Sequence, residues 1–153
     1  MREVAFEELD GIIGEQLGWS DWVTVDQDRI NAFADATGDH QWIHVDVERA
    51  RDSALGTTIA HGYLTVSLLP LLVRQVWSVS GLRMMLNYGL NRCRFPSPLP
   101  AGSRVRAGAT LADVQVESDG SKRVLLDVTV EREGSDKPVC VAQTVGRYYP
   151  AED

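Results

Sequence analysis

Asp39 and His44 form an acid/base pair in the segment Gly-Asp-His-Gln-Trp-Ile-His at residues 38–44. An imidazole takes up or releases a proton near pH 7, and a carboxylate orients a water molecule or shares its proton. His61-Gly62 comes 17 residues after His44 and opens the longest apolar segment of the chain. A Gly62 amide at the start of a helix would be unpaired and could stabilise an enolate oxygen. Together, these residues predict addition or removal of water at a polarised carbonyl compound.

Each of these signals also has an ordinary structural interpretation. An aspartate after a helix commonly caps a turn, and a lone histidine is commonly satisfied by hydrogen bonds in a core. Gly62 would equally allow a helix to pack closely on a sheet. The chemical interpretation therefore depends on the two motifs occurring together.

A metal site is an alternative, because His40 and His44 are four residues apart and further ligand types lie nearby: Asp39, Asp46 and His61. Metal-binding histidines at that spacing usually lie on one helix. Gly38 is expected to end the preceding helix, and we interpret Trp42-Ile43 as extended. We therefore expect no metal here.

The composition is that of one soluble domain, spanning residues 1–153, with 44% hydrophobic residues and a net charge of −7. This charge argues against a nucleic-acid partner, which needs a basic surface. No apolar run approaches the roughly 20 residues that cross a membrane, and the acidic N-terminus is unlike a signal peptide, so we expect a cytoplasmic protein. Cys93 and Cys140 are expected to be free, and Cys93 has no recognisable partner for a nucleophilic role.

The first half of the chain has helical patterns. A helix is predicted to begin after Asp26 as its N-cap, with one apolar face and a left-handed end at Gly38. Residues 47–55 predict a second, short helix. Residues 63–77 are apolar nearly all round, so this helix must be enclosed by other structure, and Pro70 should kink it or end its first half.

The second half has strand patterns. Strands are predicted at residues 82–95, 105–116, 124–131 and 139–149, with a bulge near Ala112-Asp113, where the alternation changes parity. Asp119-Gly120 is typical of a hairpin turn. Helices followed by an antiparallel meander indicate an α+β fold, with the sheet wrapped around the long central helix.

Residues 38–46, followed by Ile-Ala-His-Gly-Tyr at residues 59–63, resemble the MaoC-like, (R)-specific enoyl-CoA hydratases, also called hydratase 2. The segment Arg-Phe-Pro at residues 94–96 and the Pro-Ala-Gly of residues 100–102 also fit, so the resemblance covers roughly residues 15–149. Many members have Asn-Pro where this chain has Gln41-Trp42. This variant is similar to the nodulation-protein-N-like branch of the family.

The resemblance implies a hot-dog fold, usually paired into a homodimer, with Asp39 and His44 as the catalytic dyad and Gly62 as the oxyanion-hole glycine. The implied reaction is reversible hydration of trans-2-enoyl-CoA to (R)-3-hydroxyacyl-CoA in fatty acid metabolism. It needs no cofactor, because coenzyme A is part of the substrate. Pro70 stands where some members have a serine that contacts the site, and Ser67 is one turn earlier.

Further residues are predicted to bind the substrate. Gln41 and Trp42 affect substrate preference, and His61 belongs to the second motif. The acyl tail would lie along apolar residues such as Trp42, Tyr63, Met84 or Met85. The coenzyme A phosphates would meet Arg92 and Arg94, unless these are ordinary surface charges.

Two other functions fit the same fold, since a fold does not fix a function. A thioesterase would use a carboxylate-activated water on the thioester carbon. A non-catalytic acyl-binding or accessory protein would need no acid/base pair. The pairing of Asp39 and His44 with Gly62 favours hydration, and the sequence leaves open which of the two side chains is the base.

Overall fold

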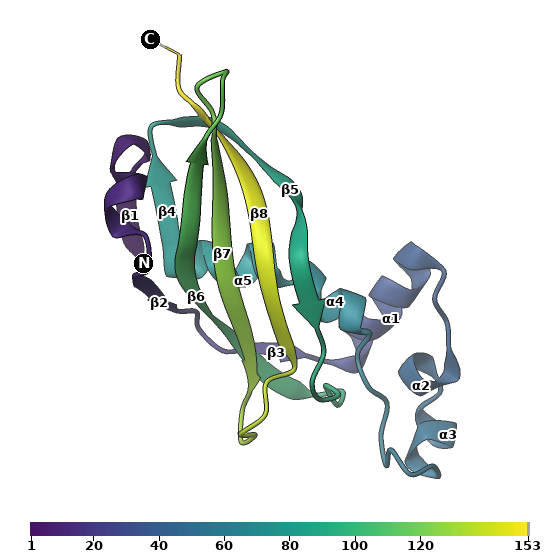
Figure 1. Cartoon of the computed structure of the whole chain (residues 1–153). Coiled ribbons are helices and arrows are strands. Elements are labelled where there is room, and N and C mark those ends of the chain that lie inside the picture. Colours follow the sequence, from purple (N-terminus) through teal and green to yellow (C-terminus); the bar gives the residue numbers. More distant parts are fainter. Residues whose placement is uncertain (153) are drawn as a thin grey trace.

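The main feature of the molecule is a six-stranded antiparallel sheet, described here from a computed structural model that covers residues 1–152. The strand order is β2-β6-β7-β8-β5, and β3 also pairs with β6. The strands are Gln16–Trp19 (β2), Val23–Val25 (β3), Leu82–Arg94 (β5), Ser103–Val116 (β6), Lys122–Arg132 (β7) and Cys140–Pro150 (β8). Figure 1 shows β6, β7, β8 and β5 side by side, with α5 behind them.

The inner face of this sheet covers two short helices in line, α4 (Gly62–Ser67) and α5 (Leu69–Val76). Pro70 cannot donate a backbone hydrogen bond, and the helix is interrupted at Leu68, as the sequence predicts. Leu64 of α4 and Leu72 of α5 are buried, and α5 contacts β2 and β6. Burying one such leucine contributes roughly 1.5–3 kcal/mol. The antiparallel sheet around a central helix confirms the predicted α+β hot-dog fold.

Strand β7 separates the two faces of the sheet by alternation. Val124, Leu126 and Val128 are buried, whereas Leu125 and Asp127 between them are half-exposed on the outer face. The predicted bulge is confirmed, because the register between β6 and β7 shifts between Leu111 and Asp113.

The helices that carry the first motif lie together at one end of the sheet, near α4 (Figure 1). Helix α1 spans Gln27–Thr37, the Asp26 side chain accepts a hydrogen bond from the Arg29 amide, and Gly38 is left-handed with φ of 77°, as predicted. Helix α3 (Val47–Arg51) is shorter than predicted.

The interpretation of Trp42-Ile43 as extended is wrong, because Trp42–Val45 forms the one-turn helix α2. An isolated turn is unstable, since its nucleation cost exceeds its gain. Here the Gln27 side chain, from α1, donates to the His44 carbonyl at 2.7 Å, and the Ile59 amide donates to the Ile43 carbonyl at 3.0 Å. Contacts from distant segments therefore stabilise a turn that the local sequence does not predict.

The N-terminal segment forms elements that the sequence patterns do not predict, and the end of the central helix and the strand order differ from the prediction. Strand β1 (Arg2–Ala5) pairs in parallel with β4 (Trp77–Ser80), and the 3-10 helix η1 (Phe6–Ile12) follows β1. Trp77 therefore begins a strand instead of ending the helix. The strands from β5 to β8 are not a simple meander, because β5 pairs with β8 beyond the β6-β7-β8 hairpins. Among residues 1–152, no helix is long and apolar enough to cross a membrane.

Candidate active site

The two sequence motifs meet in one cluster. Asp39, His44 and His61 each present a carboxylate oxygen or ring nitrogen, and these atoms lie within 4.8 Å of one another. Asp39 follows the end of α1, His44 lies in α2, and His61 is the residue before α4. The predicted convergence of a carboxylate and an imidazole is therefore present in the geometry.

His44 is buried, with 6% of its surface exposed. Its Nδ1 lies 2.7 Å from the Ile59 carbonyl oxygen. A carbonyl oxygen only accepts hydrogen bonds, so Nδ1 must carry a proton. In the neutral ring the other nitrogen, Nε2, is then a proton acceptor, which is the form that a general base needs.

His61 is buried more deeply, with 2% exposed. Its Nε2 lies 2.9 Å from the Asp39 carbonyl oxygen, so Nε2 carries the proton, while the buried Nδ1 has no hydrogen-bond partner among the described residues. The ring stacks on His44 with centroids 3.7 Å apart, and the Phe33 ring lies 5.0 Å away. No sequence pattern predicts Phe33 or the Ile59 carbonyl as parts of the site.

The Asp39 carboxylate is exposed and has one described contact, a long 3.4 Å hydrogen bond from the Gln41 amide. Its oxygens therefore keep most of their accepting capacity for a water molecule or a substrate. A carboxylate open to solvent beside a buried imidazole is an arrangement that can hold and deprotonate one water molecule.

Gly62 is the first residue of α4, and no side chain caps this end of the helix. Its amide is available to a carbonyl oxygen, as the oxyanion-hole prediction requires. Glycine is also needed for packing here, because a Cβ would lie 2.7 and 2.8 Å from two ring carbons of Phe95. Tyr63 is 75% exposed beside Phe95, at a centroid distance of 6.4 Å.

Changing Gly62 to alanine is expected to destabilise the fold by about 1–3 kcal/mol, because the methyl group overlaps the Phe95 ring. In thermal unfolding this corresponds to a fall in Tm of about 2–4 °C per kcal/mol. Gly11→Ala is the matched control, since a Cβ there meets nothing within 4 Å. Equal Tm values for the two variants would show that Phe95 moves aside freely.

The cluster fits a metal ion poorly. A shared ion would lie about 2.0–2.1 Å from both imidazole nitrogens, which requires the lone pairs of the two rings to converge. The His44 and His61 rings are stacked at an interplanar angle of 24°, with centroids 3.7 Å apart, so their lone pairs lie in two nearly parallel, separate planes. His40 points elsewhere, to Asp35 at 2.8 Å, and this hydrogen bond raises the pKa of His40.

The other residues that were predicted to contact the substrate do not lie together. Trp42 is half-buried beneath the Arg49 guanidinium, which lies 4.3 Å from the ring centroid. Arg92 pairs with Asp127 at 2.8 Å on the outer face of the sheet. Arg94 donates to the Cys93 carbonyl. Met84 and Met85 are exposed on β5.

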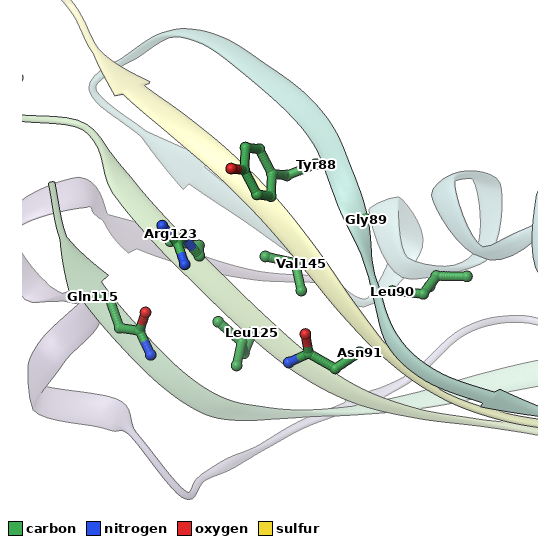
Figure 2. Close-up of a pocket in the computed structure, with 8 residues that line it drawn as sticks. All are labelled: Tyr88, Gly89, Leu90, Asn91, Gln115, Arg123, Leu125 and Val145. Atoms are coloured by element: carbon green, nitrogen blue, oxygen red, sulfur yellow. The ribbon is translucent and has the colours of Figure 1, made fainter.

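Two hollows flank the sheet. A cleft of about 660 Å³ lies between α4/α5 and strands β5, β7 and β8, with a mostly apolar lining that includes Val66, Val73, Met85 and Tyr148. A smaller hollow of about 270 Å³ lies on the outer face, where Figure 2 shows Tyr88, Asn91, Gln115 and Arg123 around it. Only the apolar cleft is lined by the helix that begins at Gly62.

The cysteines add no chemistry to the cluster. Both are free thiols. Cys140 is buried, and burial raises the pKa of its thiol to about 12, which keeps it protonated at neutral pH.

Comparison with known proteins places this fold and site in a family. Residues 8–133 match the model of the MaoC like domain. The chain is 53% identical over 141 residues to 3-hydroxyacyl-thioester dehydratase Z of Mycobacterium tuberculosis, covering 92% of this chain and 93% of that protein. It is 43% identical over 152 residues to Nodulation protein N of Rhizobium leguminosarum bv. viciae, covering 95% and 91%.

Solved structures agree on the fold. A monoamine oxidase regulatory protein from Archaeoglobus fulgius superposes with a TM-score of 0.79 at 24% identity, covering 99% of this chain and 98% of that one. The (R)-hydratase from A. caviae involved in PHA biosynthesis gives 0.71 at 19% identity, covering 88% and 94%. The chain belongs to the MaoC-like dehydratase family, and it is a hydro-lyase. The predicted nodulation-protein-N-like branch is confirmed.

Proposed function

We propose that this protein is an (R)-specific hydratase of trans-2-enoyl thioesters, working reversibly between enoyl-CoA and (R)-3-hydroxyacyl-CoA. One observation carries the proposal: the Asp39 carboxylate and the buried His44 imidazole converge beside His61, the residue immediately before Gly62 and α4. The name of the relative from M. tuberculosis, a 3-hydroxyacyl-thioester dehydratase, supports the same substrate class.

The chemistry follows from which groups donate and which accept. One water molecule donates its hydrogens to the Asp39 carboxylate and to Nε2 of His44, while the Gly62 amide donates to the thioester oxygen. As the water oxygen bonds to C3, the C2=C3 pair forms a C1=C2 bond and the carbonyl pair moves onto the thioester oxygen, giving an enolate. The Asp39/His44 pair takes one proton from the water. When the carbonyl re-forms, the C1=C2 pair takes that proton at C2, so that one water molecule has been added.

The apolar cleft is suited to the acyl chain. Val66 and Ser67 line it, and Val66 lies one turn, about 6 Å, along α4 from Gly62. A thioester held at Gly62 would therefore direct its tail past Val66 into an apolar space, toward Met85. Pro70, at the serine position of some relatives, also lines the cleft and leaves it without a hydroxyl there.

One assay tests the function against its rivals. Purified protein is mixed with crotonyl-CoA, and enoyl absorbance and free thiol are followed together. A hydratase consumes the enoyl signal without releasing thiol, and chiral analysis of the product should give the (R) enantiomer. Release of free thiol would identify a thioesterase. If neither the enoyl absorbance nor the free thiol changes, the protein is a non-catalytic binding protein.

The proposed reaction needs no metal or cofactor, because the site supplies acceptors and a backbone donor of its own. Dialysis against EDTA is expected to leave kcat for crotonyl-CoA unchanged. Added Zn²⁺ or Mg²⁺ should not raise it. If EDTA lowered kcat and a particular metal ion restored it, Asp39, His44 and His61 would be the residues that hold that ion.

We also propose that two copies pair as a homodimer through β5. This strand is 13 residues long and lies at the end of the sheet order, so its outer edge has no partner strand among residues 1–152. Its exposed side chains include several large apolar ones: Met84, Met85, Leu86, Tyr88 and Leu90. A long unpaired edge with exposed apolar side chains favours association, and pairing two β5 strands would extend the sheet.

The variant Leu86→Lys is expected to raise the Kd of the dimer by about tenfold or more, because a two-fold axis brings two like charges together. Analytical ultracentrifugation over a concentration series measures it. Ile13→Lys is the matched control, since Ile13 is 43% exposed and Leu86 is 45% exposed, but Ile13 lies outside β5. A wild-type chain that stays monomeric would contradict the pairing.

The proposed setting is fatty acid metabolism in the cytoplasm. Two free thiols in one small chain support a reducing compartment. Of the two arginines predicted to contact the coenzyme A phosphates, Arg94 is the better candidate, because Arg92 is already paired with Asp127. Replacing Arg94 would then raise KM for coenzyme A esters.

A further inference from the structure

His61 was expected to bind the substrate, but its surroundings indicate another role. With 2% of its surface exposed, it is the most deeply buried member of the cluster and packs against the His44 and Phe33 rings. Its Nε2 proton is donated to the main chain of Asp39, 22 residues earlier in the sequence. A side chain held in this way has little freedom to follow a substrate.

The same residue contacts both members of the dyad and also caps α4. Its ring provides the surface on which His44 stacks, at 3.7 Å between centroids. Its Nε2–H donates to the backbone carbonyl of Asp39 at 2.9 Å. Its own backbone immediately precedes α4 as the N-cap, and its carbonyl accepts a hydrogen bond from the Thr65 amide at 3.2 Å. One residue therefore connects the acid, the base and the helix that carries the Gly62 amide.

We propose that His61 is a positioning residue, which sets the Asp39 carboxylate and the His44 imidazole at the spacing that one water molecule can bridge. This inference rests on the proposed hydratase function. It assigns a fixed tautomer to each ring, with the proton on Nε2 of His61 and on Nδ1 of His44. Nδ1 of His61 is buried and has no hydrogen-bond partner among residues 1–152, so the ring is anchored through Nε2.

Two substitutions separate the parts of this role. His61→Phe keeps a flat ring for stacking on His44 but removes the donor to Asp39. His61→Gln places an amide N–H near the position of Nε2, so it keeps the donor and removes the ring. His40→Phe is the matched control, since His40 is exposed and pairs with Asp35.

In the crotonyl-CoA assay, His61→Phe is expected to lower kcat by about 100-fold, as a shift of the dyad by about 1 Å would. KM should stay within about threefold, because the substrate contacts are intact. His61→Gln should recover at least about tenfold of the loss, and His40→Phe should match the wild type. An unchanged kcat in His61→Phe, a loss confined to KM, or no recovery in His61→Gln would overturn the inference.

A second measurement does not depend on activity. The chain has three histidines, so long-range ¹H–¹⁵N spectra of the unliganded protein resolve each ring. We expect the Nε2–H tautomer for His61 and the Nδ1–H tautomer for His44. In His61→Phe, the signal of a single His44 tautomer should be lost. A His61 ring protonated at Nδ1 would overturn the positioning role even in an active enzyme. If the wild type hydrates nothing but shows these tautomers, the proposed function fails and the positioning of the cluster stands.

Discussion

Changing Asp39 to asparagine is expected to lower kcat for crotonyl-CoA hydration by about 10³-fold, within the range of a lost general acid or base. Asparagine has the same shape but presents an N–H group where the carboxylate accepts a hydrogen from water. The fold should be unaffected, because the Asp39 side chain is exposed and has only the 3.4 Å contact from the Gln41 amide. Initial rates and thermal unfolding measure the two effects separately.

Asp35→Asn is the control for this change. Asp35 is an exposed carboxylate on α1 that pairs with His40, and it lies outside the cluster. We expect its rate to match that of the wild type. Wild-type turnover by Asp39→Asn would exclude the proposed mechanism, whereas an equal loss in both variants would point to a general effect of surface charge.

The second large effect is expected for His44→Asn, again about 10³-fold in kcat. An asparagine amide lies near the position of Nδ1 and can still donate to the Ile59 carbonyl, but nothing replaces Nε2. The variant therefore preserves the hydrogen bond that anchors α2 and removes the proton acceptor. Circular dichroism and Tm should show a folded protein with little activity.

His44→Gln tests the complementary half of the ring. Glutamine brings a polar group near Nε2 but leaves the Ile59 carbonyl without its 2.7 Å donor. Because glutamine cannot take up a proton, activity should remain low, and stability should also fall by about 1–3 kcal/mol from the unsatisfied, partly buried carbonyl. If both variants kept full activity, His44 would be a structural histidine in the core.

Much of the fold follows from short-range patterns. Asp26 and Gly38 mark the ends of α1 through caps that involve only adjacent residues. The bulge in β6 follows from a parity change between neighbouring positions. These features are predictable because their physical cause lies within a few residues of the chain.

The errors arise where distant segments determine a local structure. The α2 turn depends on the Gln27 side chain, from the start of α1, and on the backbone amide of Ile59. The position of β5 beside β8 and the parallel pairing of β1 with β4 join segments far apart in sequence. No periodicity in one segment reveals which other segment will pair with it.

For the site, the sequence by itself determined which groups are present: a carboxylate, an imidazole and a glycine that begins a buried helix. Only the tertiary structure decided how they are arranged. It fixed the proton on Nδ1 of His44 through the Ile59 carbonyl, buried His61 beneath the dyad, and set the Phe95 ring against Gly62. Residue types carry the reactivity, whereas hydrogen-bond partners and packing across the fold set the tautomers and the distances on which that reactivity depends.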